Sequence, residues 1–276
     1  LFTAITTWML STIYNNYSFF IILFLFSFLI LGIFSDLKNN FSPKLRLLLQ
    51  SILIIFFIYL LNLKINKTGL FFLDYFIDNT IFNLLFSSIC IVILVNGSNF
   101  CDGVNCNVIG YYLIVSLAIL YGEFPNLDNF PNIKIIIIIF FIFYLSNLFQ
   151  KSFLGDNGVY VINIFMAIYL INFINVNSYI SPLLALNLLW YPAFENLFTI
   201  VRRLNANKTI DKADGLHFHT LLLKKIFKFN KNFIFSNSLT GILLNIFMFI
   251  GIFLSTNYYD DAKVLMLILI INITIY

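Results

Sequence analysis

The chain has 276 residues, of which 61% are hydrophobic and only 10% are charged. A soluble globular domain carries roughly 25% charged residues, so this composition excludes a soluble domain and predicts a polytopic membrane protein. The formal net charge of +4 gives no reason to expect a nucleic-acid partner. Cys90, Cys101 and Cys106 match neither a redox pair nor a zinc motif, and we interpret them as small buried residues.

Nine apolar runs are long enough for membrane-spanning helices, which need about 17–25 residues. In chain order they cover about 17–34, 45–63, 80–97, 105–122, 133–149, 157–175, 179–201, 238–256 and 262–276. No linker or internal repeat divides them, so residues 1–276 are expected to form one all-α domain, a transmembrane helix bundle. Residues 1–14 have the character of the tail of an earlier helix, and we expect further helices before them.

The loops between these spans alternate between two sides that differ in basic charge. Loops 35–46, 98–107, 150–157 and 202–237 together hold twelve Lys and Arg residues, and the loops on the other side hold four. The positive-inside rule therefore places the first set in the cytoplasm, with 202–237 as the largest cytoplasmic loop.

The stretch NGSNFCDGVNCN, residues 96–107, places polar groups between two apolar runs. Its Asn96, Asn99, Asp102 and Asn105 recur every third residue, which puts them along one side of a helix end. Polar side chains at membrane depth persist mainly where they line a protein or water-filled site. Amides with one carboxylate suit a nucleotide or a sugar, and an asparagine-rich helix cap is the structural alternative.

Three further polar features lie in the same set of loops. FLGDNG holds Asp156, either as a helix N-cap or as a ligand of Mg²⁺, which prefers one or two carboxylates completed by substrate phosphates. His217 and His219 are the only histidines; without a third ligand they argue against zinc, and in an extended segment they suit phosphate binding or acid–base work. Arg202 and Arg203 either bind phosphate or anchor a helix end at the membrane surface.

In order along the chain, these motifs resemble those of the polyprenyl-phosphate N-acetylhexosamine-1-phosphate transferases, glycosyltransferase family 4. GIFSDLKNNFSPKLRLLLQ is similar to the family's double aspartate followed by a basic stretch and Gln, and NGSNFCDGVNCN to its N-x-x-N-x-x-D-G-x-D/N-G motif. FLGDNG resembles its G-D-x-G loop, WYPAFENLFTIVRRL the helix into its histidine loop, and DGLHFHTLLLKK its D-x-x-H-x-H-x-L-L ending. The R-R and H-x-H forms are similar to the UDP-N-acetylglucosamine:undecaprenyl-phosphate transferase branch. The chain departs from the family at Ser35, Asn105, Cys106 and Thr220, which stand where Asp, Asp, Gly and His are common.

The resemblance implies transfer of N-acetylhexosamine-1-phosphate from a UDP-N-acetylhexosamine to undecaprenyl phosphate, with release of UMP. It places this first membrane step of cell-envelope polysaccharide synthesis at the cytoplasmic face of the bacterial inner membrane. The implied catalytic residues are Asp36, Asp102, His217 and His219. Substrate binding is assigned to Asn96, Asn99, Asn105, Lys44, Arg46, Arg202 and Arg203. Asp156 would hold Mg²⁺, with Mn²⁺ as the alternative.

Two other functions stay open. The departures at Ser35 and Asn105 allow a catalytically degenerate homologue that acts as a membrane assembly partner. A transporter would need ionisable residues near the bilayer midplane and broken helices, and the predicted spans contain almost no ionisable residue. The lipid bilayer is a partner in every case, and association into a homo-oligomer stays open.

Overall fold

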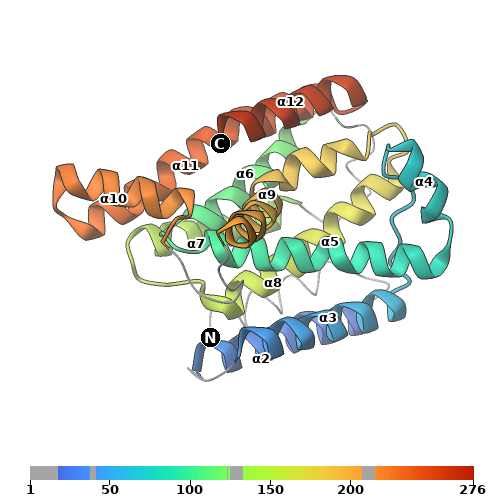
Figure 1. Ribbon diagram of the computed structural model, residues 1–276, viewed down its shortest axis with the longest axis horizontal. Helices are drawn as coiled ribbons and strands as arrows, with labels where there is room; N and C mark the ends of the chain where they lie inside the picture. The colour runs from blue at the N-terminus through green and yellow to red at the C-terminus, as the bar shows by residue number, and fades with distance from the viewer. Residues whose placement is uncertain (1–17, 38–41, 123, 125–132, 207–214) are drawn as a thin grey trace.

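The computed structural model describes residues 18–37, 42–122, 124, 133–206 and 215–276, and within those ranges it contains eleven helices and no strand (Figure 1). The helices are α2 (Ser18–Leu37), α3 (Pro43–Leu60), α4 (Phe71–Ile77), α5 (Thr80–Cys101), α6 (Asn107–Tyr121), α7 (Ile133–Leu148), α8 (Gly155–Val176), α9 (Leu183–Asn205), α10 (Phe218–Asn230), α11 (Phe233–Asn257) and α12 (Ala262–Ile275). The predicted all-α fold is confirmed.

Each of the nine predicted spans coincides with one helix. Six of these helices, α2, α3, α5, α8, α9 and α11, are long and apolar enough to cross a membrane, and α6, α7 and α12 are shorter apolar helices. Two helices were not expected, namely the short α4 in loop 62–79 and α10 in the large loop 202–237. The helix tail predicted over residues 1–14 lies outside the described residues.

Side-chain caps fix where several helices begin. Ser42 accepts a hydrogen bond from the Leu45 N–H at the start of α3, and Pro43 occupies the first turn. Asn79 caps α5 through the N–H groups of Ile81 and Phe82. Such caps satisfy N–H groups that have no partner inside the helix, so polar residues between apolar runs set the helix boundaries.

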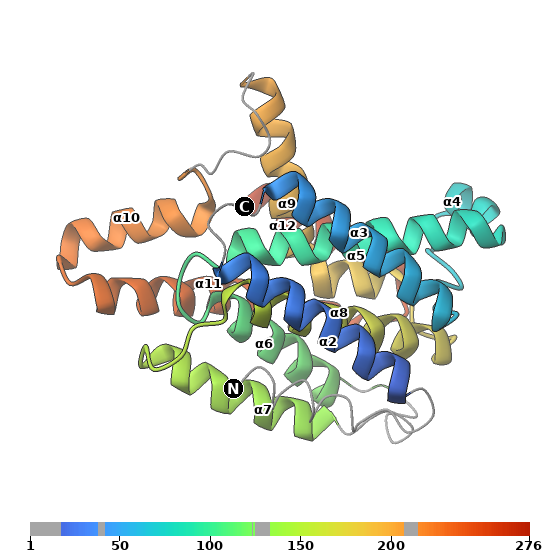
Figure 2. The same cartoon turned by 90° about the horizontal axis from the view of Figure 1, so that it is seen from below.

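Helix α8 lies inside the bundle. Of the six long helices it is the most enclosed, with 72% of its apolar window buried, and α2 lies along it (Figure 2). The two helices approach closely because position 32 is glycine: a Cβ at Gly32 would overlap the backbone of Asn157. This contact brings the end of α2 to the start of α8, where two of the polar motifs meet.

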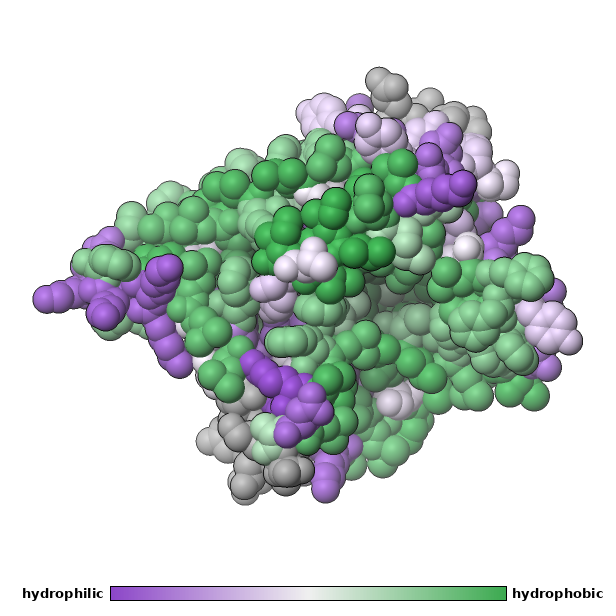
Figure 3. Space-filling view, turned by 45° about the horizontal axis from the view of Figure 1, so that its top comes forward, coloured by the Kyte–Doolittle hydropathy of each residue, from purple (hydrophilic) through white to green (hydrophobic). Residues whose placement is uncertain are grey.

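The surface has the pattern of a membrane protein. On the face shown in Figure 3, apolar side chains cover most of the middle, and hydrophilic side chains lie around the margin, at the left tip, along the right side and at the lower edge. Exposed apolar residues include Phe19 and Phe26 of α2, Phe56 of α3 and Phe249 of α11. A bilayer would bury this apolar surface.

Four polar segments lie at one end of the bundle, namely those around GIFSDL, NGSNFCDGVNCN, FLGDNG and HFH. The end of α2, the start of α3, the end of α5, the start of α8 and helix α10 gather there, and α4 lies at the opposite end (Figures 1 and 2). The polar residues that the sequence placed on one side of the membrane therefore lie together in space.

Candidate active site

Asp156 is held at the start of α8 by donors from three helices. Its Oδ2 accepts hydrogen bonds from Ser35 Oγ of α2 at 2.5 Å, from Arg46 Nη1 of α3 at 2.8 Å and from Tyr160 OH of α8 at 3.1 Å. No hydrogen bond from the described residues uses its Oδ1. One oxygen of the predicted metal ligand is thus fixed by the protein, and the other can serve a cation.

Asp36 contacts the beginning of α8. Its Oδ1 accepts a hydrogen bond from the Asp156 N–H at 3.0 Å, and its Oδ2 accepts from the Asn157 N–H at 3.4 Å and from Asn157 Nδ2 at 2.6 Å. Gly155 has a positive φ of 61°, and a Cβ there would lie 2.8 Å from Asp36 Oδ2. Asp36 therefore caps α8 from the neighbouring helix, and its predicted catalytic role stays a prediction.

Asp102 follows the last residue of α5. Burial raises its pKa well above the usual value, and the negative charges of Asp156 and Asp36 raise it further. A cation beside these three carboxylates would offset that repulsion, which fits the predicted Mg²⁺. The described residues hold no group of three His, Cys, Asp or Glu side chains that could bind a metal alone. Substrate phosphates and water would complete the shell, as Mg²⁺ commonly requires.

Neutral amides hold the loop between α5 and α6. The Asn105 N–H donates to Asn237 Oδ1 at 2.7 Å, the Cys106 N–H donates to Asn147 Oδ1 at 2.5 Å, and Asn245 Nδ2 donates to the Cys106 carbonyl at 2.7 Å. Cys106 has a φ of 65°, a left-handed conformation that glycine adopts at little cost. The departure from the family's usual glycine thus falls at the one residue of this loop with positive φ.

The predicted substrate-binding asparagines occupy different environments. Asn96 donates to Gln50 Oε1 at 3.0 Å, which joins the Gln of the first motif to the second motif. Asn99 is half-buried and makes no side-chain hydrogen bond within the described residues. Asn105 is buried, with Nδ2 3.5 Å from Ser238 Oγ of α11. Since α5 ends at Cys101, the expected row along one helix holds only for the first two asparagines.

The two histidines stack on each other beside Asp102. Their ring centroids are 5.5 Å apart and their planes differ by 9°. The backbone is extended at His217, whereas His219 lies in the first turn of α10, so the expected extended segment is wrong for the second histidine. A Cβ at Gly103 would overlap the His219 ring. The pKa of His219 is lowered to about 4, mainly by burial and secondly by the positive charge of a protonated His217. The His219 ring is therefore neutral near pH 7 and supplies no positive charge.

The basic residues of the prediction differ in their contacts. Arg203 is buried, and its guanidinium lies 5.5 Å from the centre of the Phe100 ring, which also contacts His217. Arg202 donates to the Leu216 carbonyl and so ties the end of α9 to the start of the histidine segment. Lys44 is exposed at the start of α3. Arg203 therefore lies with the histidines, and Arg46 lies with Asp156.

Sequence reasoning did not identify Glu195. This residue of α9 is 1% exposed, and its Oε1 lies 2.7 Å from His217 Nδ1. A single acidic residue inside an apolar span is itself a signal of function, because an unpaired charge at that depth is costly. Glu195 was the exception in spans that otherwise contain almost no ionisable residue.

These features define an integral membrane protein with a polar site, rich in carboxylates and amides, at one end of a helical bundle. The family described as Glycosyl transferase family 4 matches residues 18–174, more than half of the chain, and the chain belongs to that family. The match contains Asp36, Asp102 and Asp156 and ends before the histidine segment. No curated protein matches the chain. The protein is therefore a membrane transferase of the class that moves a phospho-sugar to a lipid carrier.

Proposed function

We propose that the protein transfers N-acetylhexosamine-1-phosphate from UDP-N-acetylhexosamine to undecaprenyl phosphate. A phosphate oxygen of the lipid attacks the β-phosphorus of the nucleotide sugar, the bond between that phosphorus and the bridging oxygen breaks, and UMP leaves. The observation that carries the proposal is the meeting of Asp36, Asp102, Asp156 and two histidines at one end of an apolar bundle.

Charge neutralisation is the main task of such a site, because both substrates are anions. Mg²⁺ at Asp156, or Mn²⁺ in its place, would supply positive charge to the diphosphate. Arg46 is available to the same diphosphate, since its guanidinium already lies 2.8 Å from Asp156 Oδ2 and can exchange that partner for a phosphate oxygen. Lys44, Arg202 and Arg203 add positive charge around the nucleotide, and Asn96, Asn99 and Asn105 would bind the sugar or nucleotide.

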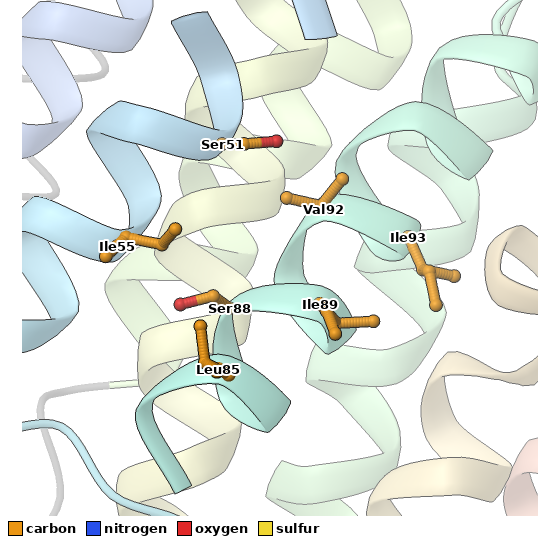
Figure 4. Close-up of a pocket in the computed structure, with 7 residues that line it drawn as sticks. All are labelled: Ser51, Ile55, Leu85, Ser88, Ile89, Val92 and Ile93. Atoms are coloured by element: carbon orange, nitrogen blue, oxygen red, sulfur yellow. The ribbon is translucent and has the colours of Figure 1, made fainter. Parts of the chain in front are cut away.

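A groove between α3 and α5 is a candidate binding site for the lipid chain. This groove of about 140 Å³ is lined by Ser51, Ile55, Leu85, Ser88, Ile89, Val92 and Ile93 (Figure 4). Gln50 precedes Ser51, Asn96 follows Ile93 by three residues, and the two side chains bond to each other, so the groove adjoins the polar motifs. Its apolar walls suit a prenyl chain.

Loop charge supports a cytoplasmic site in the bacterial inner membrane, as the first membrane step of envelope polysaccharide synthesis. Lys228→Cys in α10 tests this orientation, with Lys67→Cys as the control on the opposite side. Both variants also carry Cys90→Ser, because Cys90 is exposed, contrary to the expectation of three buried cysteines. An impermeant thiol reagent applied to intact cells should label the control and leave the 228 variant unlabelled. Labelling of the 228 variant alone would reverse the orientation.

The activity assay follows UMP release from UDP-N-acetylhexosamines with undecaprenyl phosphate and Mg²⁺, using the protein at its full length. Activity that disappears in Asp156→Asn supports the proposal. An inactive wild type that is rescued by Ser35→Asp would mean that activity was lost at that position. Inactivity of both would favour the non-catalytic assembly partner.

A further inference from the structure

Glu195 is buried and makes one short contact. Burial of a carboxylate is costly unless a partner compensates. Its Oε1 lies 2.7 Å from His217 Nδ1 and accepts a longer hydrogen bond of 3.3 Å from Thr199 Oγ1. Its Oε2 has no hydrogen-bond partner within the described residues. Within the described residues, the contact with His217 is the shorter of the two hydrogen bonds that Glu195 makes.

The carboxylate is held in place by the packing of α9 on α5. A Cβ at Gly97 of α5 would overlap the carbonyl of Pro192, so the two helices touch at that height. One residue beyond Glu195, Asn196 Nδ2 donates to the Ile93 carbonyl of α5 at 3.0 Å. Because α9 is fixed on both sides of Glu195, the position of the carboxylate determines where the His217 ring can lie.

His217 links Glu195 to the loop that carries Asp102 through its contact with His219. The His217 ring lies parallel to the His219 ring. His219 is 3% exposed, and its ring lies against Gly103, the residue after Asp102. The order of contacts is thus Glu195, His217, His219 and the Asp102 loop.

We infer from this geometry that Glu195 is a positioning residue, which accepts the Nδ1–H of His217 and so fixes its ring direction and tautomer beside the Asp102 loop. A histidine whose Nδ1–H is bound by a carboxylate acts through Nε2. The effect on turnover rests on the proposed transferase function, whereas the tautomer is a property of the chain alone.

The tautomer can be measured directly because the chain has only two histidines. Imidazole ¹⁵N spectra of the full-length protein in detergent, recorded at pH 8, should show His217 with its proton on Nδ1. Glu195→Gln should move that proton toward Nε2. Thr199→Val is the matched control, since it removes the other partner of Glu195 and leaves the His217 spectrum unchanged. His219→Gln assigns the two rings.

Turnover gives the second readout. Glu195→Gln should lower kcat by about 10- to 100-fold, the range known for loss of the carboxylate partner of a metal-bound histidine, with little change in KM for the UDP-sugar. Glu195→Asp, which keeps the carboxylate, should recover part of the loss.

Two results would overturn the inference. One is a wild-type His217 ring whose only proton is on Nε2, and the other is a Glu195→Gln variant with the wild-type tautomer and turnover. If Glu195→Gln does not fold, the wild-type spectrum decides by itself. If no form of the protein turns over any UDP-sugar, the proposed reaction fails while the tautomer still decides the role of Glu195.

Discussion

Replacing Asp36 separates a chemical role from a structural one. Its carboxylate caps α8 through two backbone N–H groups and the Asn157 side chain. Loss of a helix N-cap costs about 0.5–2 kcal/mol, and loss of a negative charge near a helix N-terminus costs about 0.3–1 kcal/mol. Asp36→Ala loses both contributions and should lower the free energy of unfolding by about 1–3 kcal/mol. Asp36→Asn keeps an acceptor and should lose only the charge contribution, less than about 1 kcal/mol.

The activities should follow the same order. A misplacement of about 1 Å in a catalytic group can cost about 100-fold in rate, and Asp36→Ala frees the turn that carries Asp156. We expect Asp36→Ala to lose most UMP release and Asp36→Asn to retain most of it. Unfolding is followed in detergent by thermal or SDS titration. Asp261→Ala is the matched control, because Asp261 caps α12 through two N–H groups and its loss should lower stability without lowering activity.

One result would refute this reasoning. If Asp36→Asn unfolds like the wild type and yet releases no UMP, the charge of Asp36 acts in the chemistry, as the family resemblance implies, and capping is secondary.

Three further predictions concern the site. Asp102→Asn and Asp156→Asn should both abolish UMP release while the protein stays folded; wild-type turnover with unchanged Mg²⁺ dependence in Asp156→Asn would exclude its metal role. The pKa of His219 is lowered from 6.5 to about 4, so its contribution to stability is fully present above pH 6.5 and is lost as the pH falls to about 4, by about 3 kcal/mol in total. Asp102, whose pKa is raised, has the opposite pH dependence. The test therefore compares the pH dependence of thermal unfolding in wild type and His219→Gln, and equal slopes would contradict the prediction. Gly103→Ala should displace the His219 ring and lower kcat by about 10-fold or more with a small change in melting temperature, and a fully active variant would show that the ring can move without consequence.

Helix content and the grouping of the motifs could be predicted from local patterns. The run FFIILFLF of α2 and the polar breaks around Ser42 and Asn79 predict helices and their limits, because apolar length and caps are local properties. Helix α10 was missed for a local reason as well. Its sequence FHTLLLKKIFKFN is amphipathic and only 13 residues long, so a search for long apolar spans passes over it.

The contacts within the site depend on packing and could not be predicted. Asp36 caps residues that follow it by 120 and 121 positions, and Glu195 meets His217 across 22 positions. No spacing rule covers such pairs, since they depend on how α2 lies on α8 and how the histidine segment folds back on α9. Ser35 is the clearest example: the sequence shows a departure from the family, and the structure shows a hydroxyl that still donates to Asp156.

The two sides of the site are held by interactions of different electrical character, so they should respond differently to ionic strength. Arg46 and Asp156, with side chains 22% and 20% exposed, form an ion pair that dissolved salt can screen over a Debye length of about 8–10 Å. The loop after Asp102 is held by Asn147, Asn237 and Asn245, whose amides carry no net charge. We therefore expect added salt to weaken the Arg46–Asp156 pair more than the amide contacts of the Asp102 loop, and only in part, because the pair is partly buried.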